Sequence, residues 1–400
     1  MTRRLWLRIG IVAVVAAVAV FYLYPPKKTI NLGLDLQGGI HLVLGVDIDK
    51  ALQVQTERAG DTVRAALEKK GVGVKSIERR GVTELAVQLA SPQAWADAQT
   101  VLKDLPIFDV KEADQAAGRL VLSMRSREVA SQREWFVKQG LETIRNRVDQ
   151  FGVAEPSIQQ QGDNRILIQL PGVQDPERAK ALIGKTALLE FKLVNDGASL
   201  EQAVAGQVPP GSELLYQRRV DKATKEERRT PFVVEKKALL TGADVANARV
   251  SIDQNTSEPY VSLELTGTGG RLFADLTSAN VGRRLAIVLD GNLYSAPVIR
   301  ERIPSGQAQI TGGFNSEEAT DLAIVLRAGA LPAPVQILEE RTVGPSLGAD
   351  SIRKGIVSSA AAALAVVLFM LIYYRLSGLV ADVALALNLL ILLAAMAGCH

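Results

Sequence analysis

Side chains that commonly carry out catalysis are sparse in this sequence. The two histidines are His41, in a predicted strand after a pair of glycines, and His400, the final residue. A Ser-His-Asp set or a metal centre requires several such side chains gathered in one place, which two distant histidines do not provide. We interpret His41 as a core or surface histidine. The sequence predicts a protein that is not an enzyme, with no catalytic residues, no bound metal and no cofactor.

The glycine-rich segment Thr266–Gly270 is the nearest approach to a nucleotide-binding loop. Its sequence, Thr-Gly-Thr-Gly-Gly, lacks the lysine of a phosphate-binding loop and the full glycine spacing of a dinucleotide-binding loop. We therefore expect a loop before a helix rather than a nucleotide site.

Asp382 is the one carboxylate within a stretch that is apolar enough to span a membrane. Burying a carboxylate in lipid is costly, so an intramembrane acid is a candidate functional residue by default. Asp382 follows Arg375 closely, however, and its carboxylate could reach water at the membrane surface. Proton handling and simple solvation both remain open for Asp382. Asn388, deeper in the same stretch, is predicted to form a hydrogen bond with a neighbouring helix.

Three apolar stretches are predicted to form membrane helices. The first lies within residues 1–27, where an uncharged run is long enough to cross the bilayer together with its flanks. A signal peptide fits the same pattern, but Tyr24-Pro25-Pro26-Lys27-Lys28 follows in place of a cleavage site, which favours an uncleaved anchor. The second and third helices, residues 351–375 and 376–400, form a tight hairpin. The chain ends near the end of the third, which indicates a truncation.

Charge distribution gives a weak preference for the orientation of the chain. Three arginines precede the first apolar run, which is typical of a cytoplasmic amino terminus, although basic residues on the other side of the helices balance them. With the amino terminus inside, residues 28–350 would lie outside the cytoplasm.

Composition limits what the protein can bind and how its large domain can be stabilised. A chain of 400 residues exceeds the ~250 to 300 residues of a single core, so it should contain more than one domain. The net charge is +3, and basic residues are mixed with acids, as in Lys222–Arg229, so nucleic-acid binding is not supported. Cys399 is the only cysteine, and the large domain must therefore be stabilised by packing without disulfides.

Hydrophobic periodicity predicts an α+β membrane protein with three units of the order βαββαβ. Such units are called split βαβ or ferredoxin-like. They cover residues 40–111, 119–194 and 260–339, and two of them contain good hairpin turns, at Gly162-Asp163-Asn164 and Asp290-Gly291-Asn292. Between Asn195 and Thr241 the pattern breaks down, which predicts a loop or small subdomain and a boundary between two lobes.

Specific motifs occur in a fixed order along this framework. They are Gly-Leu-Asp-Leu-Gln-Gly-Gly at 33–39, Gly-Val-Ala-Glu-Pro at 152–156, a strand ending in Pro171-Gly172, Leu-Asp-Gly at 289–291 with Ala-Pro-Val at 296–298, and Val-Gly-Pro-Ser-Leu-Gly at 343–348. By themselves, the paired glycines indicate only a tight turn or a close approach of another backbone segment.

The ordered motifs resemble those of the SecD family of protein translocase subunits, within the SecD/SecF group that is related to RND-type exporters. The residues that carry the resemblance are Gly33, Asp35, Gln37, Gly38, Gly39, Gly152, Glu155, Pro156, Pro171, Gly172, Asp290, Gly291, Pro297, Gly344 and Pro345. The likeness covers nearly the whole chain.

The resemblance implies a division of the chain into a base and a movable head. Residues 1–27 would be the cytoplasmic amino terminus and first membrane helix, and 28–194 a periplasmic base with an extra βαββαβ module at about 49–117. Residues 195–331 would be the head, 332–350 a return segment, 351–375 the second membrane helix and 376–400 the truncated third. We expect hinges near Asn195–Leu200 and at Leu331–Pro334, where Pro332 and Pro334 form a stiff linker.

The resemblance also implies a multi-pass protein of the bacterial inner membrane that uses the proton motive force to promote late steps of preprotein export. Its head would hold and release the emerging unfolded preprotein, and its partners would be SecF, the SecYEG channel and a YajC-like subunit. The proton-handling acid of the family lies on a membrane helix beyond residue 400. Two alternatives stay open: a porter-type domain of an RND drug exporter, and a membrane-anchored periplasmic sensor or scaffold.

Overall fold

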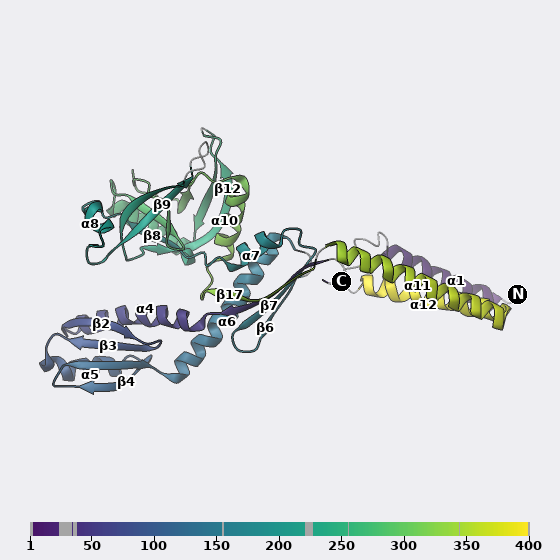
Figure 1. Cartoon of the computed structure of the whole chain (residues 1–400), viewed down its shortest axis with the longest axis horizontal. Helices are drawn as coiled ribbons and strands as arrows, with labels where there is room; N and C mark the ends of the chain where they lie inside the picture. The colour runs from purple at the N-terminus through teal and green to yellow at the C-terminus, as the bar shows by residue number, and fades with distance from the viewer. Residues whose placement is uncertain are drawn as a thin grey trace. The chain divides into compact units, whose positions relative to one another are not determined.

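The computed structural model describes residues 3–23, 34, 38–153, 156–220, 227–254, 256–343 and 345–398. Helices and strands are mixed along the chain, which confirms the expected mixture of α and β structure (Figure 1). The chain separates into two compact units. One comprises residues 1–41, 169–174 and 341–400, and the other comprises 42–168 and 175–340.

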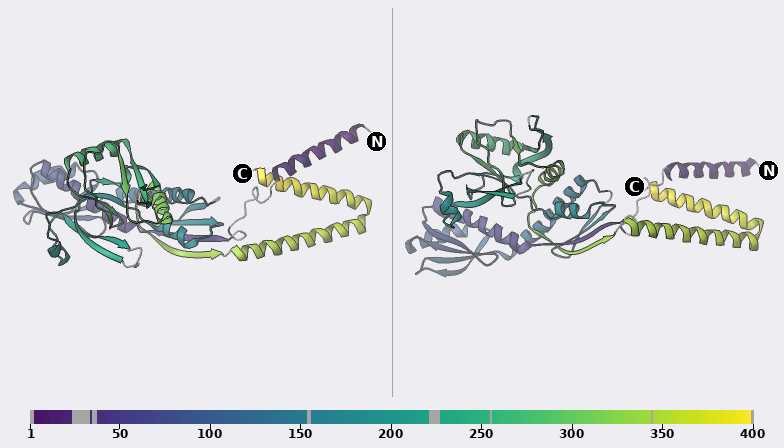
Figure 2. Two further views of the ribbon diagram at one scale, coloured as in Figure 1. Left: turned by 90° about the horizontal axis from the view of Figure 1, so that it is seen from above. Right: turned by 45° about the horizontal axis from the view of Figure 1, so that its top comes forward.

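Three long helices belong to the first unit: α1 (Arg3–Leu23), α11 (Pro345–Tyr374) and α12 (Leu376–Gly398). Helix α12 packs against both α1 and α11 (Figure 2). Two stretches, Arg353–Tyr374 and Leu376–Ala395, are long and apolar enough to cross a membrane, and only 0% and 11% of their residues are buried within the chain. Apolar side chains that face outward are typical of membrane helices rather than of core helices. The described apolar part of α1, Gly10–Phe21, is shorter, and the first membrane span therefore stays a prediction.

A four-stranded sheet forms the base, with the strand order β17-β1-β7-β6. Its elements are β1 (Gly39–Val46), β6 (Ser157–Gln161), β7 (Arg165–Pro171) and β17 (Val335–Val343), accompanied by α6 (Ser126–Phe151) and α7 (Pro176–Gly184). Helix α7 begins with a capped first turn: the Asp175 side chain accepts a hydrogen bond from the Arg178 amide at 3.0 Å, and proline occupies the first helical position.

The extra module is built on a second four-stranded sheet, with the order β2-β3-β5-β4. It contains β2 (Val74–Arg80), β3 (Glu84–Leu89), β4 (Phe108–Asp114), β5 (Arg119–Met124), α4 (Ile48–Lys69), the 3-10 turn η1 (Pro92–Ala94) and α5 (Trp95–Lys103). Residues from α4 and α5 share a buried core with alternate residues of these strands, such as Leu85 and Val87 of β3.

The head comprises the elements from β8 to α10. They are β8 (Leu189–Leu193), α8 (Leu200–Val204), β9 (Ser212–Val220), β10 (Glu227–Glu235), β11 (Leu240–Thr241), η2 (Gly242–Asp244), β12 (Val245–Ile252), β13 (Pro259–Leu265), α9 (Gly267–Ala279), β14 (Leu285–Leu289), β15 (Asn292–Ser295), β16 (Gln307–Ile310) and α10 (Ser316–Ala328). A six-stranded sheet of order β10-β9-β15-β14-β8-β11 and a three-stranded sheet of order β12-β13-β16 share one core with α9 and α10.

The predicted grouping into three ferredoxin-like units is not confirmed. The strands expected within each unit belong to different sheets: β1 and β17 lie in the base sheet, β5 in the sheet of the extra module, and β8 in the head. The local hairpins predicted at Gly162-Asp163-Asn164 and Asp290-Gly291-Asn292 form as expected, as β6–β7 and β14–β15. The extra module was predicted to end at about residue 117, but its sheet continues to Met124. A turn closed by the bond from the Gly118 amide to the Gln115 carbonyl, at 3.2 Å, leads directly from β4 to β5.

The boundary predicted at residue 195 and the hinge predicted at Asn195–Leu200 fall inside the head. Strand β8 pairs with β14 and β11, and the Asn195 amide bonds to the Val233 carbonyl at 2.8 Å, so the head sheet continues on both sides of this position. The segment 195–241 was predicted to be irregular. It contains α8 and the long hairpin β9–β10, whose charged sequence conceals its strand character.

Candidate functional site

A cleft of about 500 Å³ with both polar and apolar lining opens in the head between its two sheets. The floor is made of the buried side chains Phe191, Phe273, Leu285, Ile287 and Ile299. The rim is polar and is formed by Tyr260, Ser262, Arg300, Glu301, Gln307 and Gln309, among others. An apolar floor with a polar rim is the usual composition of a binding site for a ligand with both kinds of surface.

Local hydrogen bonds hold in position the segment from Pro297 to Ile303, which lines the cleft. The Thr277 hydroxyl donates to the Phe273 carbonyl at 2.8 Å and accepts from the Ile303 amide at 3.0 Å, so the segment that contains Ile303 is attached to the last turn of α9. The Leu285 amide donates to the Pro297 carbonyl at 2.9 Å. Pro297, predicted from the sequence as a motif residue, lines the cleft, while the neighbouring Val298 is 53% exposed.

Strand β16 is an edge strand, and it lines part of this cleft. It pairs with β13 and ends the three-stranded sheet, and its residues Gln307, Ala308 and Gln309 line the cleft. Edge strands can pair with an added extended peptide, whose alternate side chains then enter neighbouring pockets. The cleft therefore suits an extended polypeptide with apolar side chains.

The second feature of the site is the junction where the chain enters and leaves the head. The entering segment runs from the end of α7 to β8, and the leaving segment follows α10. The Leu331 amide donates a hydrogen bond of 2.8 Å to the Thr186 carbonyl, which joins the two segments directly. We refer to residues 182–187 and 329–331 as the junction.

Arg147 of α6 occupies the centre of the junction. Its guanidinium donates to the carbonyls of Leu182, Ile183 and Gly329 at 3.0 Å each, and also to the carbonyl of Lys185. The residue is 1% exposed. One buried side chain thus binds both the entering and the leaving segment.

Burial lowers the pKa of Arg147 to about 10, although the nearby carboxylate of Asp290 acts in the opposite direction. The guanidinium therefore remains charged at neutral pH. Hydrogen bonds from a charged donor are roughly twice as strong as neutral ones, and the carbonyl cradle offsets part of the desolvation cost that the lowered pKa reflects.

Asp290, predicted from the sequence as a hairpin residue, holds the start of the head sheet. Its carboxylate accepts from the amides of Ala187 and Leu188 at 3.1 and 2.9 Å, and its own amide donates to the Leu188 carbonyl at 3.0 Å. Asp290 and Gly291 both adopt positive φ angles, of 49° and 75°, as the tight turn requires.

The paired glycines meet the motif strand β7. The Gly172 amide donates to the Gly38 carbonyl at 2.9 Å. A Cβ atom at Gly39 would overlap the Leu170 carbonyl oxygen and lie 3.0 Å from the Cα of Pro171. Gly39 also has a φ of +134°, so glycine is required for both reasons. The structure therefore brings together Gly38, Gly39, Pro171 and Gly172.

The other predicted residues lie apart from one another. Gly152 ends α6 with a φ of 80°, Pro156 precedes β6, and Pro345 begins α11. Pro332 and Pro334 follow α10, and the Pro334 carbonyl accepts from the Asp47 amide at 2.8 Å. Gly33, Asp35, Gln37, Glu155 and Gly344 lie outside the described residues.

The weaker candidates for chemistry are also separated. Asp382 is partly buried on α12, with its Oδ2 atom lacking a hydrogen-bond partner among the described residues, and Asn388 is exposed on the same helix. His41 lies 3.3 Å from the Gln169 amide group through its Nδ1 atom. The Thr266–Gly270 segment starts α9, where the Thr266 hydroxyl accepts from the Gly269 amide at 3.1 Å, as expected for a helix cap. Among the described residues, no group of three or more metal-binding side chains is found.

Sequence reasoning missed Arg147, although a signal was present. Ile144 and Val148 are apolar residues four positions apart, which is helical spacing, and a residue three positions after Ile144 lies on the same helix face. A charged residue on a buried helix face indicates a polar partner in the core.

Three family models match consecutive parts of the chain. The SecD/SecF GG motif matches residues 26–47, the amino-terminal part of the SecDF P1 domain matches 137–196, and the SecDF P1 head subdomain matches 212–333. The cleft lies mostly within the last of these.

Relatives in sequence agree with these matches. The chain is 46% identical to protein translocase subunit SecD of Syntrophobacter fumaroxidans, covering 97% of this chain and 76% of the relative. It is 48% identical to SecD of Desulfurispirillum indicum, covering 98% and 76%. A crystal structure of SecDF in a super-membrane-facing form is 30% identical with a TM-score of 0.47, covering 99% of this chain and 43% of that one. A second SecDF structure, described as a membrane component that enhances protein export, is 39% identical with a TM-score of 0.41, covering 52% and 93%.

The motif resemblance is thus confirmed by relatives that share nearly half of their residues with this chain over almost its whole length. Because those relatives are protein translocase subunits and their alignment includes the paired glycines, the junction and the cleft, this chain belongs to the SecD family of protein translocase subunits.

Proposed function

We propose that the head cleft holds an extended segment of an exported polypeptide while that polypeptide is crossing the inner membrane. The observation that carries this proposal is the combination of an apolar floor with the edge strand β16 in one cleft. An unfolded chain presents both an extended backbone and apolar side chains, and this cleft is complementary to both.

The proposal extends to the setting of the whole protein. The chain would act as an accessory subunit in the bacterial inner membrane with residues 28–350 in the periplasm, and would promote late export at the expense of the proton motive force. SecF, the SecYEG channel and a YajC-like subunit are the proposed partners. The base would stay attached to the membrane helices while the head changes orientation, with Pro332 and Pro334 close to the pivot. The proton-handling groups are proposed to lie on other helices of the complex.

Site-specific photocrosslinking tests the proposal. A photoreactive amino acid replaces Val298, which is 53% exposed at the cleft, and a secretory polypeptide is stalled during export in cells that contain the full chain. The matched control is Val110 on β4 of the extra module, which is 42% exposed. We expect crosslinks to the stalled polypeptide from position 298 and not from position 110.

The same experiment separates the two alternatives. Crosslinks from position 298 only to folded proteins would favour a sensor or scaffold and contradict the proposal. Crosslinks only to a photoreactive apolar small molecule supplied to the cells would favour a porter-type exporter, and would contradict it equally.

A further inference from the structure

Helices α7 and α10 are linked to each other near both of their ends. At their carboxyl ends, the junction joins them, because Arg147 binds the carbonyls of Ile183 and Gly329 together. At their amino ends, Arg178 of α7 contacts two carboxylates of α10. The two helices therefore run in the same direction, one from the base and one from the head, and are linked through Arg147 and Arg178.

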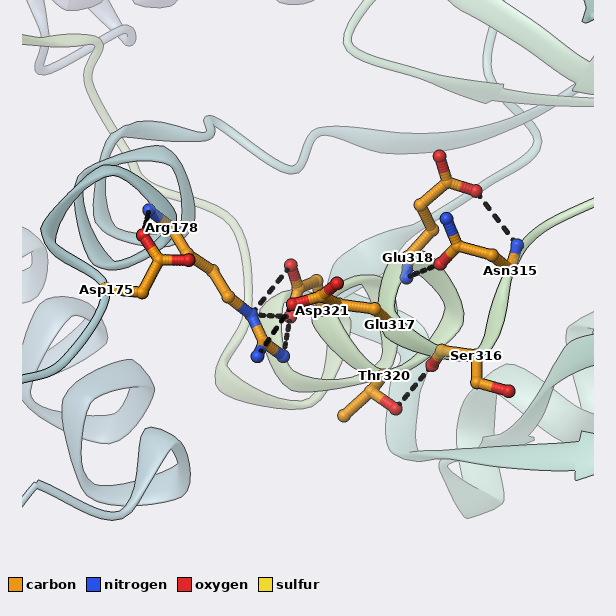
Figure 3. Close-up of polar contacts among 8 residues, drawn as sticks. All are labelled: Asp175, Arg178, Asn315, Ser316, Glu317, Glu318, Thr320 and Asp321. Atoms are coloured by element: carbon orange, nitrogen blue, oxygen red, sulfur yellow. Dashed lines mark hydrogen bonds and ion pairs between the residues drawn. The ribbon is translucent and has the colours of Figure 1, made fainter.

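The contact at the amino ends is a network of charged groups (Figure 3). The Arg178 guanidinium donates from Nη2 and Nε to Asp321 Oδ1 at 2.6 and 3.0 Å, and its Nη1 lies 2.9 Å from Glu317 Oε1. The Asp321 side chain is 16% exposed and that of Arg178 is 30% exposed. The guanidinium also lies over the Phe151 ring, 5.6 Å from its centre.

Both sides of this network are fixed on rigid helix ends. The Asp175 side chain caps α7 at the Arg178 amide. On α10, Asn315 and Glu318 form a reciprocal capping box, with bonds of 2.7 and 2.9 Å between each side chain and the other's amide. The charged groups are therefore held in place before they meet, which reduces the entropy lost on pairing.

We propose that Arg178, Asp321 and Glu317 form a latch that holds the head in its present orientation, whereas the Arg147 junction is the pivot that persists when the head turns. The latch and the pivot are separated by about two helical turns, roughly 12 Å at 1.5 Å per residue. A rotation of about 20° about the pivot would then move the latch groups apart by about 4 Å, which is enough to break the ion pairs while the junction changes little.

The chemistry of the two contacts supports this division of roles. Partly exposed ion pairs contribute little and exchange readily with water, which suits a contact that opens repeatedly. Removing a buried charged group from its partners is far more costly, which suits a contact that stays closed. The inference deepens the proposed function, since it assigns residues to the change of head orientation, but its principal test is independent of export.

Distance measurement on the full chain tests the latch. Cys399 is replaced by serine, and spin labels are attached at Gln139→Cys on α6 and Glu201→Cys on α8, both exposed positions. We expect one dominant distance in the parent chain. R178A and D321A should each increase the population at other distances relative to the dominant one by about two- to fivefold. The double variant should add nothing to the single ones, and the exchange R178D/D321R should recover the dominant distance.

Arg145→Ala is the matched control, because Arg145 pairs with Glu142 within α6 at 2.9 Å and has no part in the latch. High salt should broaden the distances of the parent chain and leave R178A unchanged. Parent-like distances in R178A, additive effects of R178A and D321A, or an equal effect of Arg145→Ala would overturn the proposal. If the latch variants behave as expected but position 298 yields no crosslink to an exported chain, the latch stands and the proposed function fails.

Discussion

At the scale of single residues, Arg147 differs from the other charged groups described in the head and base. Several of the described arginines pair with carboxylates at partly exposed positions, as Arg79, Arg125 and Arg178 do. Arg147 instead donates to several backbone carbonyls inside the protein. These carbonyls belong to a helix end and to irregular segments, which supply too few amide donors for all of them. The guanidinium, with its fixed planar array of donors, satisfies carbonyls from two distant parts of the chain.

Replacing Arg147 by methionine should lower the free energy of unfolding by about 3 kcal/mol, because several buried carbonyls lose their donor. Arg147→Lys keeps the charge but cannot reach carbonyls on both segments, so it should lose a substantial part of that stability. Denaturant titration of the purified chain measures both effects. Arg145→Ala is the control and should change the free energy by less than about 0.5 kcal/mol. Equal stability of the methionine variant and the parent would contradict the assigned role.

The lowered pKa of Arg147 determines how the stability difference between the parent chain and Arg147→Met depends on pH. The folded-state pKa is about 10, below the ordinary value of an arginine, so the unfolded chain binds the proton more tightly between those two pKa values. The cost of burying the charge is therefore constant below about pH 10 and decreases only above it. We expect the stability difference between the parent and Arg147→Met to be the same at about pH 6 and about pH 9. A difference that changes across this range would show that another titrating group is coupled to Arg147.

At the scale of secondary-structure elements, the close approach of β1 to β7 depends on Gly39. Gly39→Ala introduces a Cβ that overlaps the Leu170 carbonyl oxygen, and the strands must separate locally. The expected loss of stability is about 2 to 4 kcal/mol. The control is Gly71→Ala, where φ is also positive, at +78°, but no atom lies within 4 Å of the new Cβ. It should lose only about 1 kcal/mol. Similar losses in thermal unfolding for both variants would mean that backbone strain alone matters at Gly39.

Local elements could be predicted from the sequence, whereas the pairing of distant strands could not. The helix starts at Asp175-Pro176 and Asn315–Glu318 are local features of the sequence, because capping depends on residues three positions apart. The sheet that each strand joins depends on partners far along the chain, and β5 and β8 were therefore grouped wrongly. The cleft combines residues from β8, α9, β14 and β16, and no pattern in the sequence connects these segments. Asp290 and Pro297 were identified through motif resemblance, which gave their positions but not their contacts.

At the scale of the whole molecule, the orientation of the chain in the membrane can be tested with cysteine labelling. After Cys399→Ser, we introduce Lys103→Cys at the end of α5 or Arg375→Cys at the turn between α11 and α12. A membrane-impermeant maleimide should label position 103 in cells with a permeabilised outer membrane, whereas position 375 should react only after lysis. Labelling in the reverse order would contradict the proposed periplasmic location.

The hydrogen bond between Leu331 and Thr186 has a consequence for protein engineering. The polypeptide enters and leaves the head at points that are only one such bond apart, so the head is a cassette inserted at a single position of the base. Ligating Thr186 to Leu331 through a short glycine linker would excise the cassette without stretching the remaining chain. A foreign domain with adjacent termini could be grafted at the same position. Exchange of cassettes between relatives would then replace the proposed polypeptide-binding cleft while preserving the base and the membrane helices.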